Sequence, residues 1–525
     1  MTPARDHDPR RRADEAATLR PISLTALAAA VTLKLAIHLP LVSRYGYFRD
    51  ELYFLDLGRN LDWGYVDCAP LIGLLARLAL LLGGSLEVLR VIAALAGAGV
   101  VAMAVLLARE LGGGRFAQFL AGLAVIATPI FLATSSIMTM NGFEPLFWLG
   151  CAWVIARLVR TGDSRLWLAF GLLAGLGLQN KHSMLVFGAA VALALPLTGL
   201  RRELARRWIW LGLGVALLLF LPNVLWQVAN DFPTLEDLRN VRESGKNVVL
   251  APPAFLGQQA MMVHPLLAPL WVGGLLALLA GRLRAWRPLG LTYLFVLAVF
   301  MVMHGKDYYV APAYPMLFAA GAVAVEAWLD RVSSPRRSTW PRVAAVGWIA
   351  TAGAATLPLV TPLLPPERYV AYQRALGVEA QKTEVAHEGP LPQIFGDQFG
   401  WPEFAADVAR VYRALPAEER ARACIFANNY GEAGALSLFG PGLGLPTVIS
   451  GHQNHFFWGP KGCSGEVLIV TQSDREDLEE VCASVEQAGT HAHPWGMAEE
   501  NQPIWVCRGL EPPPAELWPR VKHWN

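Results

Sequence analysis

Charge is scarce in this chain, and two common kinds of binding motif are missing. Only 16% of the 525 residues are charged while 54% are hydrophobic, a composition too apolar for a soluble globular protein. The net charge of +2 gives no argument for a nucleic-acid partner. No G-x-x-x-x-G-K-[ST] motif occurs, which argues against a nucleotide-binding loop, and the lack of a C-x-x-C pair disfavours a zinc site.

Long hydrophobic runs fill the chain before residue 365. Their length predicts a polytopic α-helical membrane protein with about eleven transmembrane helices. No small-residue cleavage pattern follows the basic N-terminus, so the first run is expected to be retained as a helix. The expected spans are 21–43, 86–108, 116–137, 143–159, 166–179, 184–199, 208–228, 254–280, 288–304, 310–329 and 343–364.

Arginine clusters in alternate gaps orient the expected bundle. The positive-inside rule assigns these gaps to the cytoplasm, so the tail 1–20 is expected inside a bacterial-type inner membrane. The transmembrane domain then covers 21–364, its first outer loop is 44–85, and everything after 365 lies outside. Arginines in the first outer loop oppose the rule, but acids accompany them. The clusters lie at 10–12, 109–115, 157–165, 201–207, 282–287 and 331–342.

After residue 365 short segments of alternating type replace the long runs. They predict a small soluble α/β domain, 365–525, with a largely parallel sheet. Its four cysteines allow three disulfide pairings in an oxidising compartment, and a bridge between Cys482 and Cys507 is one candidate. Strands are expected at 423–427, 447–450, 466–471 and 504–507, and helices at 432–439 and 475–486.

An acidic pair wrapped in aromatic residues, Asp50-Glu51, follows the first span. It begins an amphipathic stretch, 51–59, which predicts a helix in the membrane interface. Because acids at membrane depth are costly, a carboxylate in this position is typical of a site, for example as a general base. The alternative is a solvated acid that only offsets Arg44 and Arg49.

Two further outer gaps flank the fourth and fifth spans. Glu144 lies just inside the fourth span, either as a functional acid or as a helix-start acid favoured by the helix dipole. Lys181 and His182 separate two short spans on the outer side, where they can hold a phosphate. Snorkelling to the interface explains Lys181 equally well.

Another outer gap holds His304, Lys306 and Asp307, followed by the aromatic pair Tyr308-Tyr309. Cations and acids that converge on one face suit phosphate chemistry or metal binding. His264 lies within a neighbouring outer-side span beside a proline, and a packed, hydrogen-bonded histidine is its simpler interpretation, since one histidine is no metal site.

These motifs together resemble the family 39 glycosyltransferases of the GT-C superfamily, which include protein O-mannosyltransferases and the lipid A aminoarabinose transferase. The resemblance spans most of 44–364. In this family His-Pro-Pro often follows the aspartate of the second motif, whereas here Cys68-Ala69-Pro70 follows Asp67. The acid of the second outer gap is often an aspartate and is Glu144 here, unless Asn141 is its equivalent. The matching segments are Asp50-Glu51, 64–71, 141–148, 180–183 and 305–309.

The resemblance implies a GT-C-like membrane glycosyltransferase that uses a sugar carried on a polyprenyl phosphate. The acceptor is a lipid, a glycan or a protein. Asp50 would be the general base on its hydroxyl, and a single displacement would invert the anomeric carbon. A lipid carrier also fits the outward-facing site, because nucleotide sugars are made in the cytoplasm.

The remaining candidates fall into groups by role. Glu51 is the second catalytic candidate, and a divalent ion such as Mg²⁺, Mn²⁺ or Zn²⁺ is conceivable, although no spacing demands one. The donor-phosphate candidates are Lys181, His182, Lys306 and Arg49. The substrate-binding candidates are Asp67, Asn141, Glu144, Tyr308 and Tyr309, and the metal-ligand candidates are Glu51, Glu144, His264 and His304.

Two other function classes stay open. A transporter would place ionisable residues at the bilayer midplane and show two related halves, whereas here charges gather at one face and no repeat is visible. A sensor would use the outer α/β domain as its receptor, for which so many spans are excessive. Substitution of Asp50 would spare ligand binding in a sensor and abolish turnover in an enzyme.

Overall fold

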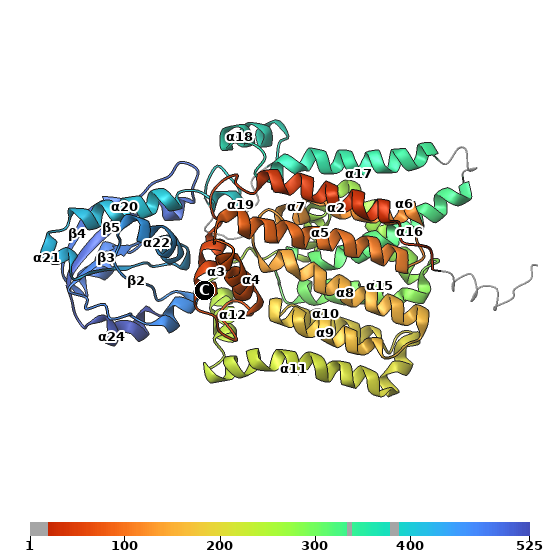
Figure 1. Ribbon diagram of the computed structural model, residues 1–525, viewed down its shortest axis with the longest axis horizontal. Helices are drawn as coiled ribbons and strands as arrows, with labels where there is room; N and C mark the ends of the chain where they lie inside the picture. Colours follow the sequence, from red (N-terminus) through yellow and green to blue (C-terminus); the bar gives the residue numbers. More distant parts are fainter. Residues whose placement is uncertain (1–18, 333–338, 379–387, 525) are drawn as a thin grey trace, which may run out of the picture.

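The computed structural model describes residues 19–332, 339–378 and 388–524. The basic cluster 10–12 and all but the last two residues of the expected tail 1–20 lie outside the described residues. The described chain forms a bundle of long helices with a small α/β domain at one end (Figure 1). Three helices lie where the two parts meet: α3 (Arg49–Arg59), α4 (Leu71–Leu81) and α12 (Pro233–Glu243).

Each of the eleven expected spans contains helix. Among the described residues seven helices are long and apolar enough to cross a membrane, or nine if each of two bent pairs is one span. The count falls below eleven because α9 is short and because proline at 129, which lacks an N–H, divides another span. The bundle helices are α2 (Leu24–His38), α5 (Leu86–Glu110), α6 (Arg115–Ala127), α7 (Pro129–Ala133), α8 (Met140–Thr161), α9 (Leu166–Asn180), α10 (Met184–Ala194), α11 (Arg207–Ala229), α13 (Pro252–Met262), α14 (Ala268–Leu279), α15 (Arg287–Val302), α16 (Tyr314–Val332) and α17 (Thr339–Val360).

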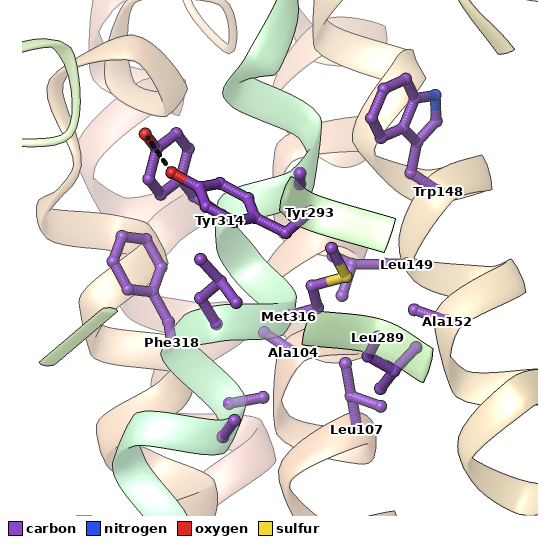
Figure 2. Packing of buried hydrophobic residues seen from close by; sticks show 14 of the residues in the cluster. Ala104, Leu107, Trp148, Leu149, Ala152, Leu289, Tyr293, Tyr314, Met316 and Phe318 are labelled. Carbon is purple, nitrogen blue, oxygen red and sulfur yellow. Dashed lines mark hydrogen bonds between the residues drawn. The ribbon is translucent and has the colours of Figure 1, made fainter. Parts of the chain in front are cut away.

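The bundle core is packed with large apolar side chains from α5, α8, α15 and α16 (Figure 2). Trp148 is buried there, as are the rings of Tyr293 and Tyr314. The two tyrosine hydroxyls lie 3.1 Å apart, and Tyr314 also donates to Oε1 of Gln259 at 3.1 Å. These bonds offset the cost of burying polar groups in an apolar core, which keeps this part of the bundle tightly packed.

The outer domain is built on one mixed sheet. Its strand order is β2-β1-β3-β5-β4, in which β2, β1 and β3 are parallel while β5 and β4 are antiparallel additions. The expectation of a largely parallel sheet is therefore wrong for half of the pairings. The strands are β1 (Ala423–Phe426), β2 (Val448–Ile449), β3 (Val467–Thr471), β4 (Cys482–Thr490) and β5 (Pro503–Leu510).

One expected helix of this domain is also wrong. The segment 475–486 begins as the short helix α23 (Arg475–Glu479), but its second half starts strand β4. A disulfide joins Cys482 to Cys507, with the Cα atoms 5.6 Å apart, and β4 pairs with β5. Cross-strand pairing overrides the local helix preference of the segment. A second disulfide joins Cys424 to Cys463, so two of the three open pairings are excluded.

Helices cover the sheet and connect it to the bundle. The helices α20 (Trp401–Ala414) and α22 (Tyr430–Leu443) share an apolar core with the strands. α22 also packs on α3, so the first outer loop is in direct contact with the C-terminal domain. Shorter helices are α18 (Pro366–Ala375), α19 (Gln393–Gly396), α21 (Ala417–Arg420) and α24 (Pro514–Leu517).

Candidate active site

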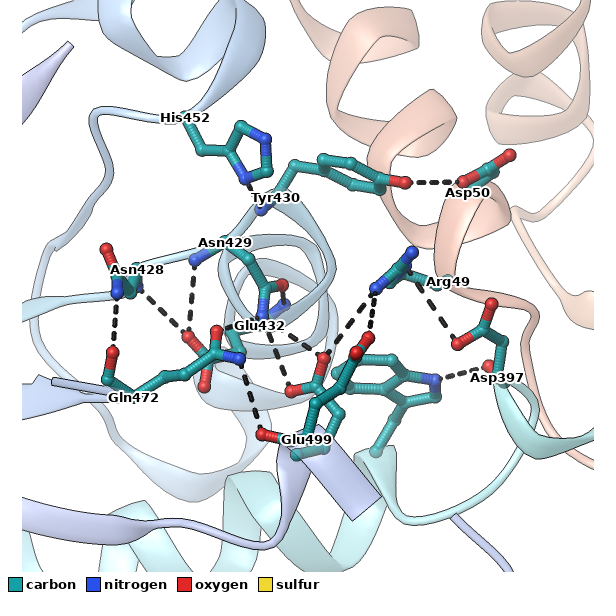
Figure 3. A network of polar contacts seen from close by, with 12 residues as sticks. Arg49, Asp50, Asp397, Asn428, Asn429, Tyr430, Glu432, His452, Gln472 and Glu499 are labelled. Carbon is teal, nitrogen blue, oxygen red and sulfur yellow. Dashed lines mark hydrogen bonds and ion pairs between the residues drawn. The ribbon is translucent and has the colours of Figure 1, made fainter. Parts of the chain in front are cut away.

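Asp50 lies in the first turn of α3, where a helix favours an acid because of its dipole. The residue is half-buried. Its Oδ1 accepts a hydrogen bond from the hydroxyl of Tyr430 at 2.9 Å (Figure 3). Tyr430 is the first residue of α22 in the outer domain. The predicted general base is therefore held where the outer domain meets the bundle.

Glu51, the second catalytic candidate, is fully buried. Its carboxylate accepts hydrogen bonds from the backbone N–H groups of Phe48 and Met138, both at 2.8 Å. It also lies 3.5 Å from Nη2 of Arg90. A carboxylate enclosed in this way cannot reach a substrate, so the position of Glu51 fits an anchor that fixes the start of α3.

Arg90, on α5, is a site-supporting residue that the sequence analysis missed. Its guanidinium is buried and donates to the backbone carbonyls of Arg44 and Gly46 and to Oε1 of Gln398 at 3.0 Å. It thus ties the turn before α3 to both the bundle and the outer domain. A lone arginine within an apolar span is costly, and this signal could have identified it.

Asp67, Asp237 and Asp50 form an acidic group. Asp67 accepts a hydrogen bond from the hydroxyl of Tyr53 at 3.0 Å. Burial, together with the negative charges of Asp237 and Asp50, raises the pKa of Asp67 to about 7, although the hydrogen bond from Tyr53 opposes this. Burial likewise raises the pKa of Asp237, against the nearby charge of Lys306. Asp67 is therefore close enough to Asp50 for the two charges to interact.

Lys181 is the centre of a second group of predicted residues. Its Nζ lies 2.6 Å from Oδ1 of Asn141 and 3.2 Å from Oε2 of buried Glu144. The same Nζ lies 4.3 Å from the ring centre of Tyr309 and 5.8 Å from that of Tyr308, as in cation–π contacts. The structure thus brings together four predicted substrate-binding residues around one predicted phosphate-binding cation.

Lys306 and His182 lie at the edges of this group. The Nζ of Lys306 lies 6.0 Å from the ring centre of Tyr308, so that ring faces both lysines. The charge of Lys306 also acts on Asp237, which links the lysine group to the acidic group. The Nε2 of His182 pairs with Oδ1 of Asn223 at 3.1 Å.

Arg49 is a predicted phosphate ligand whose side chain meets the outer domain. It is buried, and its guanidinium lies among three carboxylates of the outer domain (Figure 3). The nearest nitrogen–oxygen distances are 3.0 Å to Glu499, 3.9 Å to Glu500 and 4.0 Å to Asp397. Arg49 therefore joins α3 to the outer domain, and its charge is already matched by acids.

The metal-ligand candidates do not come together. Within the described ranges no three His, Cys, Asp or Glu side chains are grouped as metal ligands. Glu51 is paired with Arg90, and Glu144 with Lys181. The Nδ1 of His264 accepts from the backbone N–H of Leu266, which makes it a turn cap, and His304 is exposed. These residues do not fit a shared ion.

Comparison with known proteins supports the family resemblance. Residues 67–226 match the family of dolichyl-phosphate-mannose-protein mannosyltransferases. The fold is similar to that of ArnT from Cupriavidus metallidurans, in its apo state and bound to undecaprenyl phosphate. In both comparisons the TM-score is 0.58 and the identity 15%, over 92% of this chain and 97% of ArnT. No curated protein sequence matches this chain significantly.

The fold is that of a polytopic α-helical membrane protein, and residues 67–226 carry the match to the mannosyltransferase family. These similarities confirm the predicted resemblance to GT-C glycosyltransferases, and the structure confirms the predicted combination of a membrane helix bundle with a C-terminal α/β domain.

Proposed function

We propose that this protein transfers a sugar from a polyprenyl-phosphate donor to an acceptor hydroxyl on the outer face of the membrane. Asp50 takes the proton of the acceptor hydroxyl while its oxygen attacks the anomeric carbon. The bond from that carbon to the phosphate oxygen breaks, the polyprenyl phosphate leaves, and the configuration inverts. Asp50 then releases the proton to solvent, which regenerates the base.

The observation that carries the proposal is that the fixed carboxylate of Asp50 and a separate group of lysines occur in the same region. Asp50 is fixed by Tyr430 at 2.9 Å and interacts with the charge of Asp67. Lys181 and Lys306 both lie near the ring of Tyr308, and the charge of Lys306 acts on Asp237 of the acidic group. One region therefore offers a base for the acceptor and cations for the leaving phosphate.

The cation site has the chemistry that a departing phosphate needs. The ammonium of Lys181 is held by Asn141 and Glu144, so it is oriented before the donor arrives. Two tyrosine rings beside it offer an apolar wall to the sugar or the prenyl chain. Such preorganised charge lowers the barrier most when negative charge develops in the transition state.

Two further findings support the donor and the side of the membrane. ArnT, which shares the fold, has been solved with undecaprenyl phosphate bound, and a carrier of this kind is the donor proposed here. The two disulfides of the α/β domain suit an oxidising compartment outside the cytoplasm. The proposed topology therefore places the tail 1–20 inside an inner membrane and the α/β domain outside.

The test uses the full-length protein in native-lipid nanodiscs with a panel of polyprenyl-phosphate sugars. Release of polyprenyl phosphate is compared between wild type, Asp50→Asn and the matched control Asp62→Asn, which changes an exposed acid of the same loop. We expect release by wild type and Asp62→Asn, and a loss of at least about 1,000-fold in Asp50→Asn. Equal release by all three proteins would refute Asp50 as the base.

A further inference from the structure

Tyr430, which holds Asp50 in the proposed mechanism, comes from the outer domain and not from the bundle. It is 380 residues from Asp50 in the sequence and belongs to the outer domain, yet its hydroxyl donates to the carboxylate of Asp50. A phenol hydroxyl that donates to a carboxylate stabilises the ionised form and restricts rotation of the carboxylate. Both effects matter for a group that must be ionised and aimed before it can act as a base.

Tyr430 is itself held firmly in place. It opens α22 directly after Asn429, whose side chain caps the helix by accepting from the backbone N–H of Glu432 at 2.9 Å. The backbone N–H of Tyr430 donates to Nδ1 of His452 at 3.2 Å. The ring centre of Tyr430 lies 5.0 Å from that of Tyr53 and 5.0 Å from that of His452. These contacts of the backbone and the ring therefore fix the position of the Tyr430 hydroxyl.

The helix that carries Asp50, α3, is held by the same part of the outer domain as Tyr430. Arg49 precedes Asp50, and its guanidinium carbon lies 5.4 Å from the ring centre of Tyr430. The same guanidinium is paired with Glu499 and Glu500. Glu500 in turn accepts a hydrogen bond from Nδ2 of Asn429, the cap residue of α22, at 3.1 Å. Arg49 and Asp50 of α3 are thus both held by the N-terminal end of α22 in the outer domain.

We infer that Tyr430 is a positioning residue of the glycosyl-transfer site, so that docking of the outer domain completes the catalytic base. This inference rests on the proposed function and assigns the α/β domain a part in the chemistry itself. Tyr430 keeps its proton throughout. It donates a hydrogen bond to Asp50 before and during the attack, and no atom is exchanged between the two residues.

The test compares Tyr430→Phe with wild type. The substitution removes the hydroxyl but keeps the ring that packs against Tyr53 and His452. Loss of a hydrogen bond to a charged group is expected to lower kcat by about 10- to 100-fold with little change in KM for the donor. Tyr412→Phe is the matched control, because the hydroxyl of Tyr412 in the same domain donates to the backbone carbonyl of Arg420 instead.

A second measurement does not depend on turnover. The protonation of Asp50 is followed by its carboxyl infrared band, assigned by its absence in Asp50→Asn, as the pH is changed. We expect the midpoint in Tyr430→Phe to rise by about one pH unit over wild type, and the midpoint in Tyr412→Phe to stay unchanged. The other titratable groups around Tyr430 and Asp50, namely Arg49, Tyr53, Asp67 and His452, are the same in all three proteins.

The outcomes separate this inference from the proposed function. An unchanged midpoint in Tyr430→Phe overturns the inference, even if kcat falls, because general loosening of the domain would explain the slower rate. A raised midpoint together with a reduced kcat supports both proposals. A raised midpoint in a protein that transfers no sugar from any donor supports the role of Tyr430 and refutes the glycosyl-transfer function.

Discussion

Replacing Arg90 with methionine is expected to damage the site from a distance. Arg90 is buried, and it connects the turn before α3 with Glu51 and with Gln398 of the outer domain. Methionine has a similar length but no charge and no donor. In the variant, Glu51 keeps its two backbone donors but loses its cation, and the carbonyls of Arg44 and Gly46 lose the guanidinium.

The magnitude follows from the burial of both partners. Removal of one member of a buried ion pair typically costs about 3–5 kcal/mol, because the other charge stays buried without compensation. Replacement of both members removes that charge. The double variant Arg90→Met/Glu51→Gln is therefore expected to be more stable than Arg90→Met alone, by about 1–3 kcal/mol.

The assay is a double-mutant cycle on the full-length protein in detergent. Unfolding is followed in wild type, the two single variants and the double variant, and donor turnover is measured in parallel. We expect Arg90→Met to lose activity together with stability, since the start of α3 carries Asp50. If the two substitutions acted additively, with no coupling between them, the idea that Arg90 and Glu51 form one anchor would be refuted.

The remaining predictions concern the cation site and a buried acid pair. Lys181→Met should lower kcat for donor turnover by at least about 100-fold, while Lys181→Arg should retain part of it, and wild-type kcat in Lys181→Met would exclude a role in leaving-group stabilisation. Burial raises the pKa of Glu432 from an ordinary 4.5 to about 7, against the hydrogen bonds from Thr471, Asn429 and Asn428. Folding therefore takes up a proton between these pH values, and the free energy of unfolding should fall as the pH rises through this window. Glu432→Gln should remove this loss, so the variant should be more stable than wild type by about 3 kcal/mol above pH 7 and equally stable below pH 4.5. Thermal unfolding of both proteins, measured once above pH 7 and once below pH 4.5, checks this. A gain in stability of equal size under both conditions would contradict it.

The sequence predicted the membrane bundle because the bilayer imposes one strong constraint. A span needs about 20 apolar residues, and this length is visible in the chain whatever its neighbours are. The outer domain was harder to predict, because strand pairing depends on partners far away in the sequence. The segment 482–486 was expected to be helical but belongs to strand β4, which pairs with β5 and is joined to it by the disulfide between Cys482 and Cys507.

The lysine group was predictable in composition but not in arrangement. Asn141, Lys181 and Tyr309 come from three separate outer gaps, and the sequence placed all three on one face of the membrane. Only the packing of the helices shows that Lys181 lies 2.6 Å from Asn141 and 4.3 Å from the ring centre of Tyr309. Tyr430 could not be predicted at all, because its contact with Asp50 depends on how the outer domain docks.

The three charged residues that open α3 lie in three different surroundings, which the sequence could not show. Successive residues of a helix point about 100° apart, so neighbours in sequence serve different surroundings. Arg49 faces the acids of the outer domain, Glu51 faces Arg90 inside the bundle, and Asp50 lies half-buried between them. The flanking charges hold the helix from two sides, and Asp50 is the more exposed of the two carboxylates.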